Sequence, residues 1–293
     1  MNPDFPGLAK PQSSARLHRI VSHDGVALAA DDFGPLGAPA VVLLHGGGQT
    51  RHSWSGAAKA LAQRGYRVIN FDARGHGESD WSETGAYSLD DRVRDLEAIV
   101  ARLDRPFALV GASLGGATAI HAVAHAMRPG AVVLVDIVPH PEIDGISRIV
   151  AFMRANPHGF ATLDEAVDAV AAYNPERPRP RDPGGLMRNL RQREDGRLYW
   201  HWDPRIVAYR PQDHHEVVRK SAAKLPESGL PVLLVRGLKS DVVSDAGVAA
   251  FRELVPDLEV ADVGGAGHMV AGDRNDAFNG AVIAFLERHL PTD

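Results

Sequence analysis

The chain has 293 residues, a formal net charge of −5 and no cysteine. The missing cysteines exclude a disulfide scaffold, a thiol nucleophile and cysteine-ligated metal centres. The acidic balance argues against a nucleic-acid-binding protein, because such proteins carry a basic surplus. Apolar residues make up 44% and charged residues 24% of the chain, as in ordinary globular proteins, and the 29 glycines are a modest excess.

The N-terminal stretch MNPDFPGLAKPQ lacks the continuous apolar run of a signal peptide. No stretch approaches the ~18 apolar residues that a membrane span requires. We therefore expect a soluble, cytoplasmic protein that acts on a small-molecule substrate and binds neither membrane nor nucleic acid. The sequence leaves the oligomeric state open.

Strand and helix patterns alternate along most of the chain. Two strands joined by a turn at Gly25 come first, and continuous Val- and Leu-rich runs then predict parallel strands covered on both faces. The expected strands are 17–22, 26–31, 40–44, 66–71, 107–110, 131–135, 231–235 and 258–262. The expected helices between them are 54–64, 89–103, 114–127, 244–254 and 276–290. This alternation predicts an α/β fold with a mostly parallel eight-stranded sheet flanked by helices.

The region 139–226 interrupts this alternation. It has no clear strand, but helical patterns fall at 146–155, 163–173 and 186–193 and keep apolar faces to bury. We therefore expect a helical cap inserted after the sixth strand, over a core formed by 1–138 and 227–293. Seven arginines lie in this region, and we interpret them as a solvated surface rather than a carboxylate site: Arg177, Arg179, Arg181, Arg188, Arg191, Arg193 and Arg197.

The sequence Gly111-Ala112-Ser113-Leu114-Gly115 fits the pattern G-x-S-x-G and lies between a predicted strand and a predicted helix. A serine on so tight a turn is exposed at the carboxyl edge of the sheet, and the small residues around it let strand and helix approach closely. The N–H groups at the start of the helix can stabilise an oxyanion there. Ser113 is therefore predicted to be a nucleophile.

At this point the chain resembles the α/β-hydrolase fold family over nearly its whole length. The motif His45-Gly46-Gly47-Gly48 follows the third strand, as the family's oxyanion loop does. The run DARGHGES at 72–79 is similar to the family's D-x-R-G-x-G-x-S turn, and GGAGH at 264–268 stands where the family keeps its histidine. The resemblance implies an oxyanion hole made by the backbone N–H groups of Gly47 and Leu114.

A serine nucleophile needs a base, and His268 is the best candidate among 14 histidines because a loop of small residues precedes it. His45 is expected to have a structural role in the oxyanion loop. His121 and His125 are four residues apart on one predicted helix, a spacing that can hold a metal. Because Ala122 stands where a zincin has its glutamate, we expect packing or solvent contact instead. No metal and no cofactor are predicted.

The base needs a carboxylate partner, and the sequence offers two main candidates. Asp241 follows the next-to-last strand in the order Ser…Asp…His of the family, and it is the preferred acid. Asp136, which ends the strand after the nucleophile helix, is the alternative that some family members use. Asp262 ends the last strand and is too close to His268 in sequence to reach around its ring. The predicted triad is therefore Ser113, Asp241 and His268.

Four tryptophans are candidates to line the substrate pocket, although each could equally belong to the core: Trp54, Trp81, Trp200 and Trp202. The predicted reaction is hydrolysis of a carboxylic ester or lactone of a small apolar or aromatic substrate, through an acyl-enzyme on Ser113. Carbon–carbon bond hydrolases and cofactor-free perhydrolases or haloperoxidases share the same residues and remain alternatives. A non-hydrolytic small-molecule receptor that keeps the fold is the alternative from another class.

Overall fold

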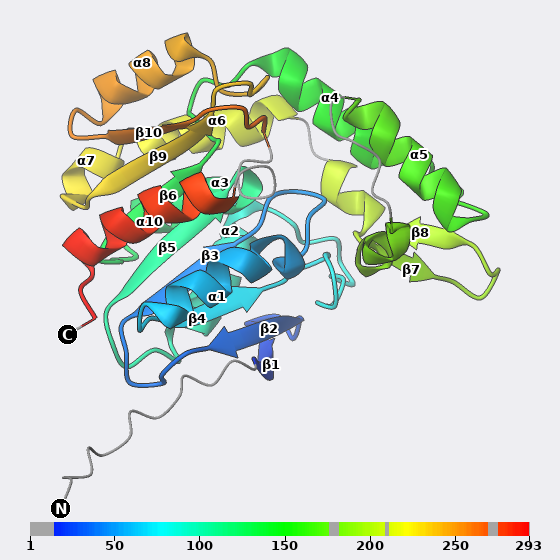
Figure 1. The fold of residues 1–293 in the computed structure, drawn as a ribbon, viewed down its shortest axis with the longest axis horizontal. Coiled ribbons are helices and arrows are strands. Elements are labelled where there is room, and N and C mark those ends of the chain that lie inside the picture. Colours follow the sequence, from blue (N-terminus) through cyan, green and yellow to red (C-terminus); the bar gives the residue numbers. More distant parts are fainter. Residues whose placement is uncertain (1–14, 176–181, 209–210, 269–274, 293) are drawn as a thin grey trace, which may run out of the picture.

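The structure is a computed structural model that describes residues 15–175, 182–208, 211–268 and 275–292 (Figure 1). Its centre is an eight-stranded sheet with the order β1-β2-β4-β3-β5-β6-β9-β10. In this sheet β1 pairs antiparallel with β2, β2 pairs antiparallel with β4, and all other pairs are parallel. The strands are β1 (Arg16–Val21), β2 (Ala27–Phe33), β3 (Ala40–Leu44), β4 (Arg67–Phe71), β5 (Phe107–Ala112), β6 (Ala131–Val135), β9 (Val232–Gly237) and β10 (Glu259–Val263). The predicted mostly parallel sheet is confirmed.

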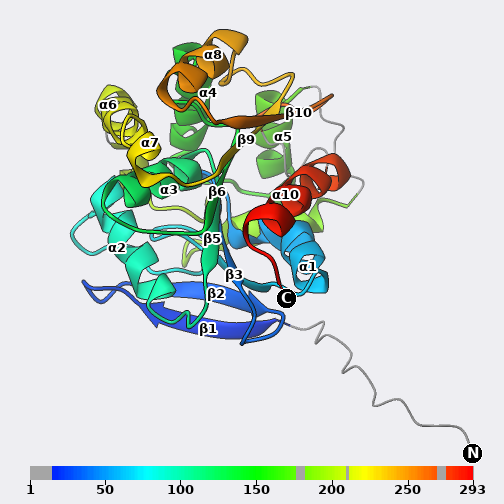
Figure 2. The same ribbon diagram turned by 90° about the vertical axis from the view of Figure 1, so that its left-hand side faces the viewer.

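The central strands are buried on both faces because helices cover both. Every residue of β3 and β6 is buried, as their uninterrupted apolar sequences predict. Figure 2 shows α1 (Ser55–Gln63) and α10 (Asn275–His289) on one side of the sheet, and α2 (Leu89–Val100) and α3 (Leu114–Ala124) on the other. The helix α8 (Asp245–Leu254) contributes Val248 and Phe251 to the same core cluster as α2 and α3.

The start of α2 shows how local sequence fixes an element. The Ser88 hydroxyl accepts a hydrogen bond from the N–H of Asp91, and the Asp91 carboxylate accepts one from the N–H of Ser88. This reciprocal capping box satisfies two backbone donors that the helix itself cannot use. Here aspartate takes the place of the usual glutamate, and the predicted helix start is confirmed.

The segment between β6 and β9 contains both predicted and unpredicted elements. In chain order these are α4 (Ile143–Arg154), α5 (Leu163–Tyr173), a 3-10 helix (Pro183–Asn189), β7 (Leu190–Gln192), β8 (Leu198–Trp200), a second 3-10 helix (Pro204–Ala208), α6 (Pro211–Ala222) and α7 (Leu225–Ser228). In Figure 1, α4, α5, β7 and β8 lie together beyond the carboxyl ends of the parallel strands. By contrast, α6 and α7 contact α3. The division into a core and a cap of 139–226 stays a prediction.

The prediction of a helix at 186–193 and of no strand in this region was wrong. Residues Leu190–Gln192 pair antiparallel with Leu198–Trp200 to form a small hairpin. Proline and two glycines at 183–185 work against a regular α-helix, and Asp195-Gly196 supplies the turn. Buried Leu190, Leu198 and Trp200 put the apolar face of the hairpin against the inside of the segment. Among the described residues, no helix is long and apolar enough to cross a membrane.

Candidate active site

Ser113 occupies a strained turn between β5 and α3. Its φ of 46° and ψ of −111° lie in a region that residues with a side chain rarely adopt. The turn is tight enough to demand glycine nearby, because a Cβ on Gly115 would lie 2.2 Å from the carbonyl oxygen of Leu44. Strain of this kind persists where the surrounding structure enforces it, and it is frequent at functional sites. The local geometry is that of a nucleophile elbow.

The loop after β3 lies beside this serine. A Cβ built on Gly46 would stand 3.5 Å from the Cβ of Ser113. The N–H of Gly46 donates to Gln49 Oε1 at 3.0 Å, and the N–H of Gly48 donates to His76 Nε2 at 3.2 Å. Within the described part of the chain, the N–H of Gly47 has no such partner. Gly47 therefore offers a free donor close to the nucleophile.

A second donor comes from the helix after Ser113. Leu114 is the first residue of α3, and the first N–H groups of a helix have no partner inside it. The positive end of the helix dipole adds to the local attraction for negative charge. The two predicted backbone donors, Gly47 and Leu114, thus come from the loop after β3 and from the start of α3, which meet at Ser113.

Three buried histidines hold the Gly46–Gly48 loop through backbone hydrogen bonds. His45 Nε2 accepts from the N–H of Ala73 at 2.9 Å, and its Nδ1 donates to the carbonyl of Gly46 at 2.8 Å. His76 accepts from Gly48 on Nε2, as described above, and donates from Nδ1 to the carbonyl of Arg74 at 3.1 Å. Each ring therefore uses one nitrogen as acceptor and one as donor, which is the neutral form.

The third histidine comes from the segment between β6 and β9. His201 Nδ1 accepts from the N–H of Gly77 at 2.7 Å, and its Nε2 donates to the carbonyl of Gly48 at 3.2 Å. Burial, which penalises the charged form, lowers the pKa of His201 to about 3 and also lowers the pKa values of His45 and His76. His201 thus links the Trp200–Trp202 region to the oxyanion loop through neutral hydrogen bonds.

The D-x-R-G-x-G-x-S turn positions His76 through a buried charge network. Asp72 is fully buried and accepts from the backbone and guanidinium of Arg51 at 2.6 and 2.5 Å, and from the N–H of Glu78 at 2.9 Å. Arg74, also fully buried, makes a two-pronged pair with Asp95 at 2.7 and 2.6 Å. These bonds hold the 72–79 loop against the sheet. The motif that supported the family resemblance is therefore structural.

His268 contacts Asp136. The Nδ1 of His268 lies 2.7 Å from Asp136 Oδ2. Asp136 is fully buried at the end of β6, where its φ of 49° turns the chain out of the strand. The N–H of Gly237 donates to its Oδ1 at 3.1 Å, and the hydroxyl of Ser240 donates to its Oδ2 at 2.5 Å. These donors satisfy and orient a buried carboxylate that would otherwise be costly.

The structure corrects the preference for Asp241 as the acid. Asp241 forms an ion pair with Arg148 of α4, and its side chain is 38% exposed. The two aspartates follow neighbouring strands, because β6 and β9 pair directly. The chain order Ser…Asp…His is kept with Asp136 in the middle position. The alternative acid named from the sequence is thus the one that contacts His268.

The four tryptophans fall into different environments. Trp54 is 1% exposed and packs against Phe278 of α10 on the far side of the sheet, in the core cluster that includes α1 and α10. It is therefore a core residue, which is the alternative to the pocket role that the sequence left open. Trp81 is half-buried, with the guanidinium of Arg191 5.3 Å from its ring centre.

Trp200 and Trp202 are buried and stacked on each other, with ring centres 5.0 Å apart and planes at 11°. Met153 of α4 belongs to the same cluster and reaches the oxyanion loop: its Sδ lies 3.7 Å from the position of a Cβ on Gly47. The Nε1 of Trp202 donates to the carbonyl of Met153 at 3.3 Å. Trp202 therefore holds the backbone of Met153, and Trp200 belongs to the same buried cluster.

Of the seven arginines between 177 and 197, the structure describes four, and three of these make protein contacts. Arg191 donates to the carbonyl of Gly77, Arg193 lies 3.8 Å from the ring centre of Tyr199, and Arg197 donates to the carbonyls of His158 and Gly159 at 2.8 and 3.0 Å. Arg188 is exposed. Arg177, Arg179 and Arg181 lie outside the described residues. For Arg191, Arg193 and Arg197, surface packing explains the side chain without an anionic ligand.

Three contributors to the site escaped the sequence analysis: Ser240, His76 and His201. Ser240 stands directly before Asp241, so a pattern that selects carboxylates after strands passes over it. His76 and His201 act through backbone groups of loops far away in sequence, and only the tertiary fold brings them to Gly48. For Asp136 a signal was present, since it directly ends the fully apolar run of β6.

Comparisons with known proteins agree with this geometry. The sequence profile described as alpha/beta hydrolase fold matches residues 39–274. The esterase Rv0045c of Mycobacterium tuberculosis is 31% identical over 248 residues, covering 81% of this chain and 79% of that protein. The mouse sn-1-specific diacylglycerol lipase ABHD11 is 32% identical over 263 residues, covering 85% and 81%.

A solved structure of E-2-(acetamidomethylene)succinate hydrolase superposes with a TM-score of 0.80 at 25% identity, covering 93% of this chain and 99% of that one. The similarity therefore extends over most of the chain. With a family match over most of its length and relatives that are esterases and lipases, this chain belongs to the α/β-hydrolase fold family, as an enzyme of the carboxylic ester hydrolase type.

Proposed function

We propose that this enzyme hydrolyses carboxylic esters or lactones with a small apolar acyl group, through an acyl-enzyme on Ser113. His268 is the general base and Asp136 is its partner. The observation that carries the proposal is the 2.7 Å contact between His268 Nδ1 and the buried carboxylate of Asp136, at the sheet edge that also bears Ser113. A carboxylate there fixes the proton on Nδ1 and leaves Nε2 free to act as a base.

In the first half-reaction, Ser113 Oγ attacks the ester carbonyl while His268 Nε2 takes the hydroxyl proton. The carbonyl oxygen becomes an oxyanion, which accepts hydrogen bonds from the N–H groups of Gly47 and Leu114. The tetrahedral intermediate collapses, the ester C–O bond breaks, and His268 gives the proton to the leaving alkoxide. The products are an alcohol and the acyl-enzyme.

In the second half-reaction, a water molecule takes the place of the alcohol. His268 removes its proton as it attacks the acyl carbonyl, and the same two N–H groups stabilise the second oxyanion. Collapse breaks the bond to Ser113 Oγ, which recovers its proton from His268. The carboxylic acid leaves, and Asp136 stabilises the imidazolium during both steps.

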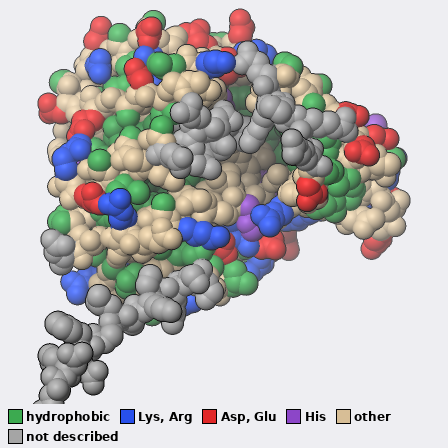
Figure 3. Space-filling model, in the orientation of Figure 1, with side chains coloured by type: hydrophobic (Ala, Val, Ile, Leu, Met, Phe, Trp, Pro, Cys, Tyr) green, Lys and Arg blue, Asp and Glu red, His purple; other side chains and the backbone are tan. Residues whose placement is uncertain are grey.

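The preference for an apolar acyl group comes from the residues beside the oxyanion loop. Met153 covers Gly47 and Gly48, and the stacked pair Trp200 and Trp202 stands behind it. Figure 3 shows a hollow in this face between the sheet and the β7–β8 end of the molecule, with hydrophobic side chains beside it. A thioether is adaptable and makes favourable contacts with short alkyl and aromatic groups.

Active-site labelling tests the proposal directly. The purified full chain is treated with a fluorophosphonate probe, and turnover of p-nitrophenyl acetate and butyrate is followed in parallel. We expect rapid labelling and turnover in the parent, neither in Ser113→Ala, and parent behaviour in Ser147→Ala, which alters an exposed serine on α4. The absence of both labelling and turnover in folded parent protein would favour a non-hydrolytic receptor.

A further inference from the structure

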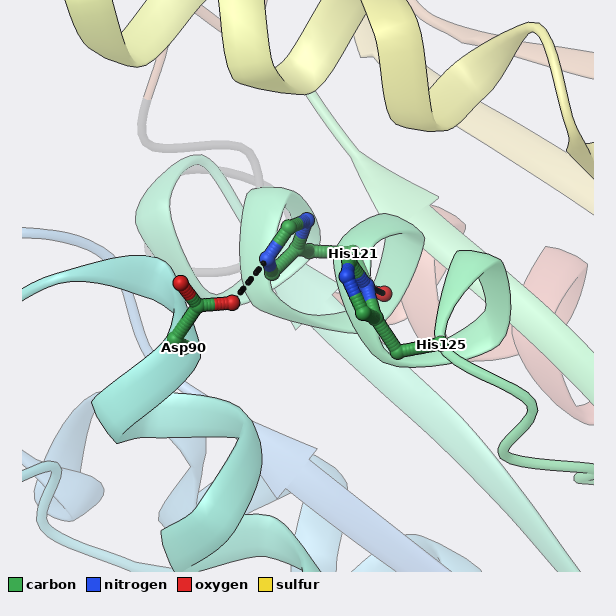
Figure 4. Close-up of side chains that lie close together, drawn as sticks. All are labelled: Asp90, His121 and His125. Atoms are coloured by element: carbon green, nitrogen blue, oxygen red, sulfur yellow. Dashed lines mark hydrogen bonds and ion pairs between the residues drawn. The ribbon is translucent and has the colours of Figure 1, made fainter.

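A cluster of metal-ligating side chains lies outside the proposed active site. Asp90, in the first turn of α2, lies near His121 of α3 and His125, the residue that follows α3 (Figure 4). One ligand atom from each residue lies within 4.8 Å of the other two. His121 Nε2 is 2.8 Å from Asp90 Oδ1, and the two imidazole ring centres are 4.1 Å apart. Ligand atoms around one tetrahedral ion with bonds of about 2.0–2.2 Å stand about 3.3–3.6 Å apart, so binding would widen the His121–Asp90 pair and draw more distant ligand atoms together.

The hydrogen bonds of the two imidazoles resemble those of metal-bound histidines. The Nδ1 of His125 lies 2.9 Å from the carbonyl of His121, so this nitrogen donates and the neutral ring keeps a lone pair on Nε2. The Nδ1 of His121 lies 2.8 Å from the hydroxyl of Ser221 on α6. A hydroxyl can accept a proton donated by Nδ1, which frees Nε2 of His121 for a metal. Such outer contacts orient the rings of ligating histidines.

The charge around the cluster sets limits on the ligand. The carboxylate of Asp90 is 71% exposed, so water can complete the coordination. Arg94 and Lys224 are close enough to influence Asp90 and His121, respectively, and their positive charge opposes a cation. The site therefore needs an ion that binds imidazole strongly.

We propose that Asp90, His121 and His125 bind one divalent transition-metal ion, of which Zn²⁺ is the probe of choice. Two imidazoles and one carboxylate suit zinc, nickel and copper, whereas calcium and magnesium prefer oxygen ligands. His121 and His125 have the spacing of a zincin's histidine pair but not its glutamate, since Ala122 stands there. The third ligand proposed here is Asp90, from a neighbouring helix. The ion would join the start of α2 to α3, the helix that begins beside Ser113.

Zinc binding to the full chain, freed of any affinity tag, tests this proposal by calorimetry. We expect one strong site in the parent, with affinity at least tenfold lower in His125→Gln and in Asp90→Asn. The control His158→Gln removes an exposed histidine of the α4–α5 loop and should bind as the parent does. Circular dichroism without zinc shows whether each variant is folded. Magnesium in place of zinc should give no strong site.

Thermal melts supply a second readout. A ligand that binds only the folded state stabilises it by an amount that grows with the logarithm of its concentration relative to Kd. At one zinc concentration, the Tm of the parent and of His158→Gln should therefore rise more than that of His125→Gln. Ser221→Ala should weaken zinc binding about 10–100-fold if Ser221 orients His121. No strong site in the parent, or equal affinity in the parent, His125→Gln and Asp90→Asn, would overturn the proposal. Because binding is measured without substrate, the result is independent of the proposed esterase activity.

Discussion

Two aspartates that follow neighbouring strands have opposite surroundings. Asp136, after β6, is fully buried, contacts His268 and accepts hydrogen bonds from Gly237 and Ser240. Asp241, after β9, is 38% exposed and pairs with Arg148, whose side chain is 63% exposed. Both turns are at the carboxyl edge of the sheet, where sites of α/β proteins form. Position at this edge therefore does not decide the role of a carboxylate.

Burial with enough donors is what distinguishes the two. A buried carboxylate holds an imidazole in one orientation because little water competes for it and its other lone pairs are occupied. An exposed pair gains little, since solvent screens the charges and two long side chains must be ordered. The contrast predicts a large catalytic effect at the first turn and a small one at the second.

The largest expected effect is that of Asp136→Asn. An amide there can no longer stabilise the imidazolium or fix the proton on Nδ1, and loss of this function costs about 10⁴-fold in kcat in serine hydrolases of the triad type. Asp241→Asn should change kcat by less than about twofold, because surface pairs contribute little. Both constants come from initial rates on p-nitrophenyl butyrate. A large loss of kcat in Asp241→Asn with little change in Asp136→Asn would instead identify Asp241 as the acid.

The contrast between buried and exposed contacts extends to the links between the β6–β9 segment and the rest of the molecule. His201 is a buried link and should make stability depend on pH. Its pKa is about 3 in the folded protein and near 6.5 when unfolded, so below pH 6.5 the unfolded chain binds a proton that the folded chain does not. The stability that the neutral His201 ring contributes is fully present above pH 6.5 and is lost as the pH falls towards 3.

Between pH 7 and pH 4.5, His201 alone should lower the free energy of unfolding by about 2–3 kcal/mol. Urea unfolding of the parent and His201→Gln at several pH values isolates it, because the other histidines titrate in both proteins. The stability of His201→Gln should fall less between pH 7 and 4.5 than that of the parent. The exposed control His158→Gln should follow the parent, and parallel curves for parent and His201→Gln would show that the ring is not held neutral.

Ser240 lies in the turn after β9, directly before Asp241, but its hydroxyl donates to Asp136 in the other turn. Removing a hydrogen bond to a charged group costs about 1.5–3 kcal/mol, so Ser240→Ala should lower kcat by about 10–100-fold with little change in KM. Ser240→Thr keeps a hydroxyl and should recover most of the rate. A loss that Thr does not restore, or a change in KM alone, would mean that Ser240 only packs the turn.

Most of the fold could be predicted from the sequence because its signals are local. The apolar runs at 40–44 and 131–135 are buried strands with the predicted bounds, and α2 begins at the predicted residue 89, behind a cap made by Ser88 and Asp91. The hairpin of β7 and β8 was missed because each strand has only three residues, too few for a clear alternation. Its pairing depends on Gly196 at the turn.

The parts of the site that lie in short sequence motifs could be predicted. Ser113 and the loop at Gly46–Gly48 lie in short patterns with a fixed strand and helix context, and the structure brings them together. The partner of His268 could not be predicted, because the choice between Asp136 and Asp241 depends on which side chain the fold buries. His201 shows the same limit, since 124 residues separate it from the N–H of Gly77 that it accepts from.

The smallest expected effect is at the exposed pair of Arg148 and Asp241. A double-mutant cycle of Arg148→Ala and Asp241→Asn, measured by urea unfolding, should give a coupling of about 0.2–1 kcal/mol that shrinks at high salt. The helix α4 that carries Arg148 also carries Met153, but the backbone holds its start: the N–H of Glu142 donates to the carbonyl of Val242 at 2.9 Å, and Gly145 packs against the carbonyl of Asp241. Loss of the pair should therefore leave esterase rates within about twofold, consistent with the small contribution of exposed pairs. A coupling well above this range, or a tenfold loss of rate in Arg148→Ala, would mean that the exposed pair positions α4 over the oxyanion loop, and the contrast between the two turns would fail.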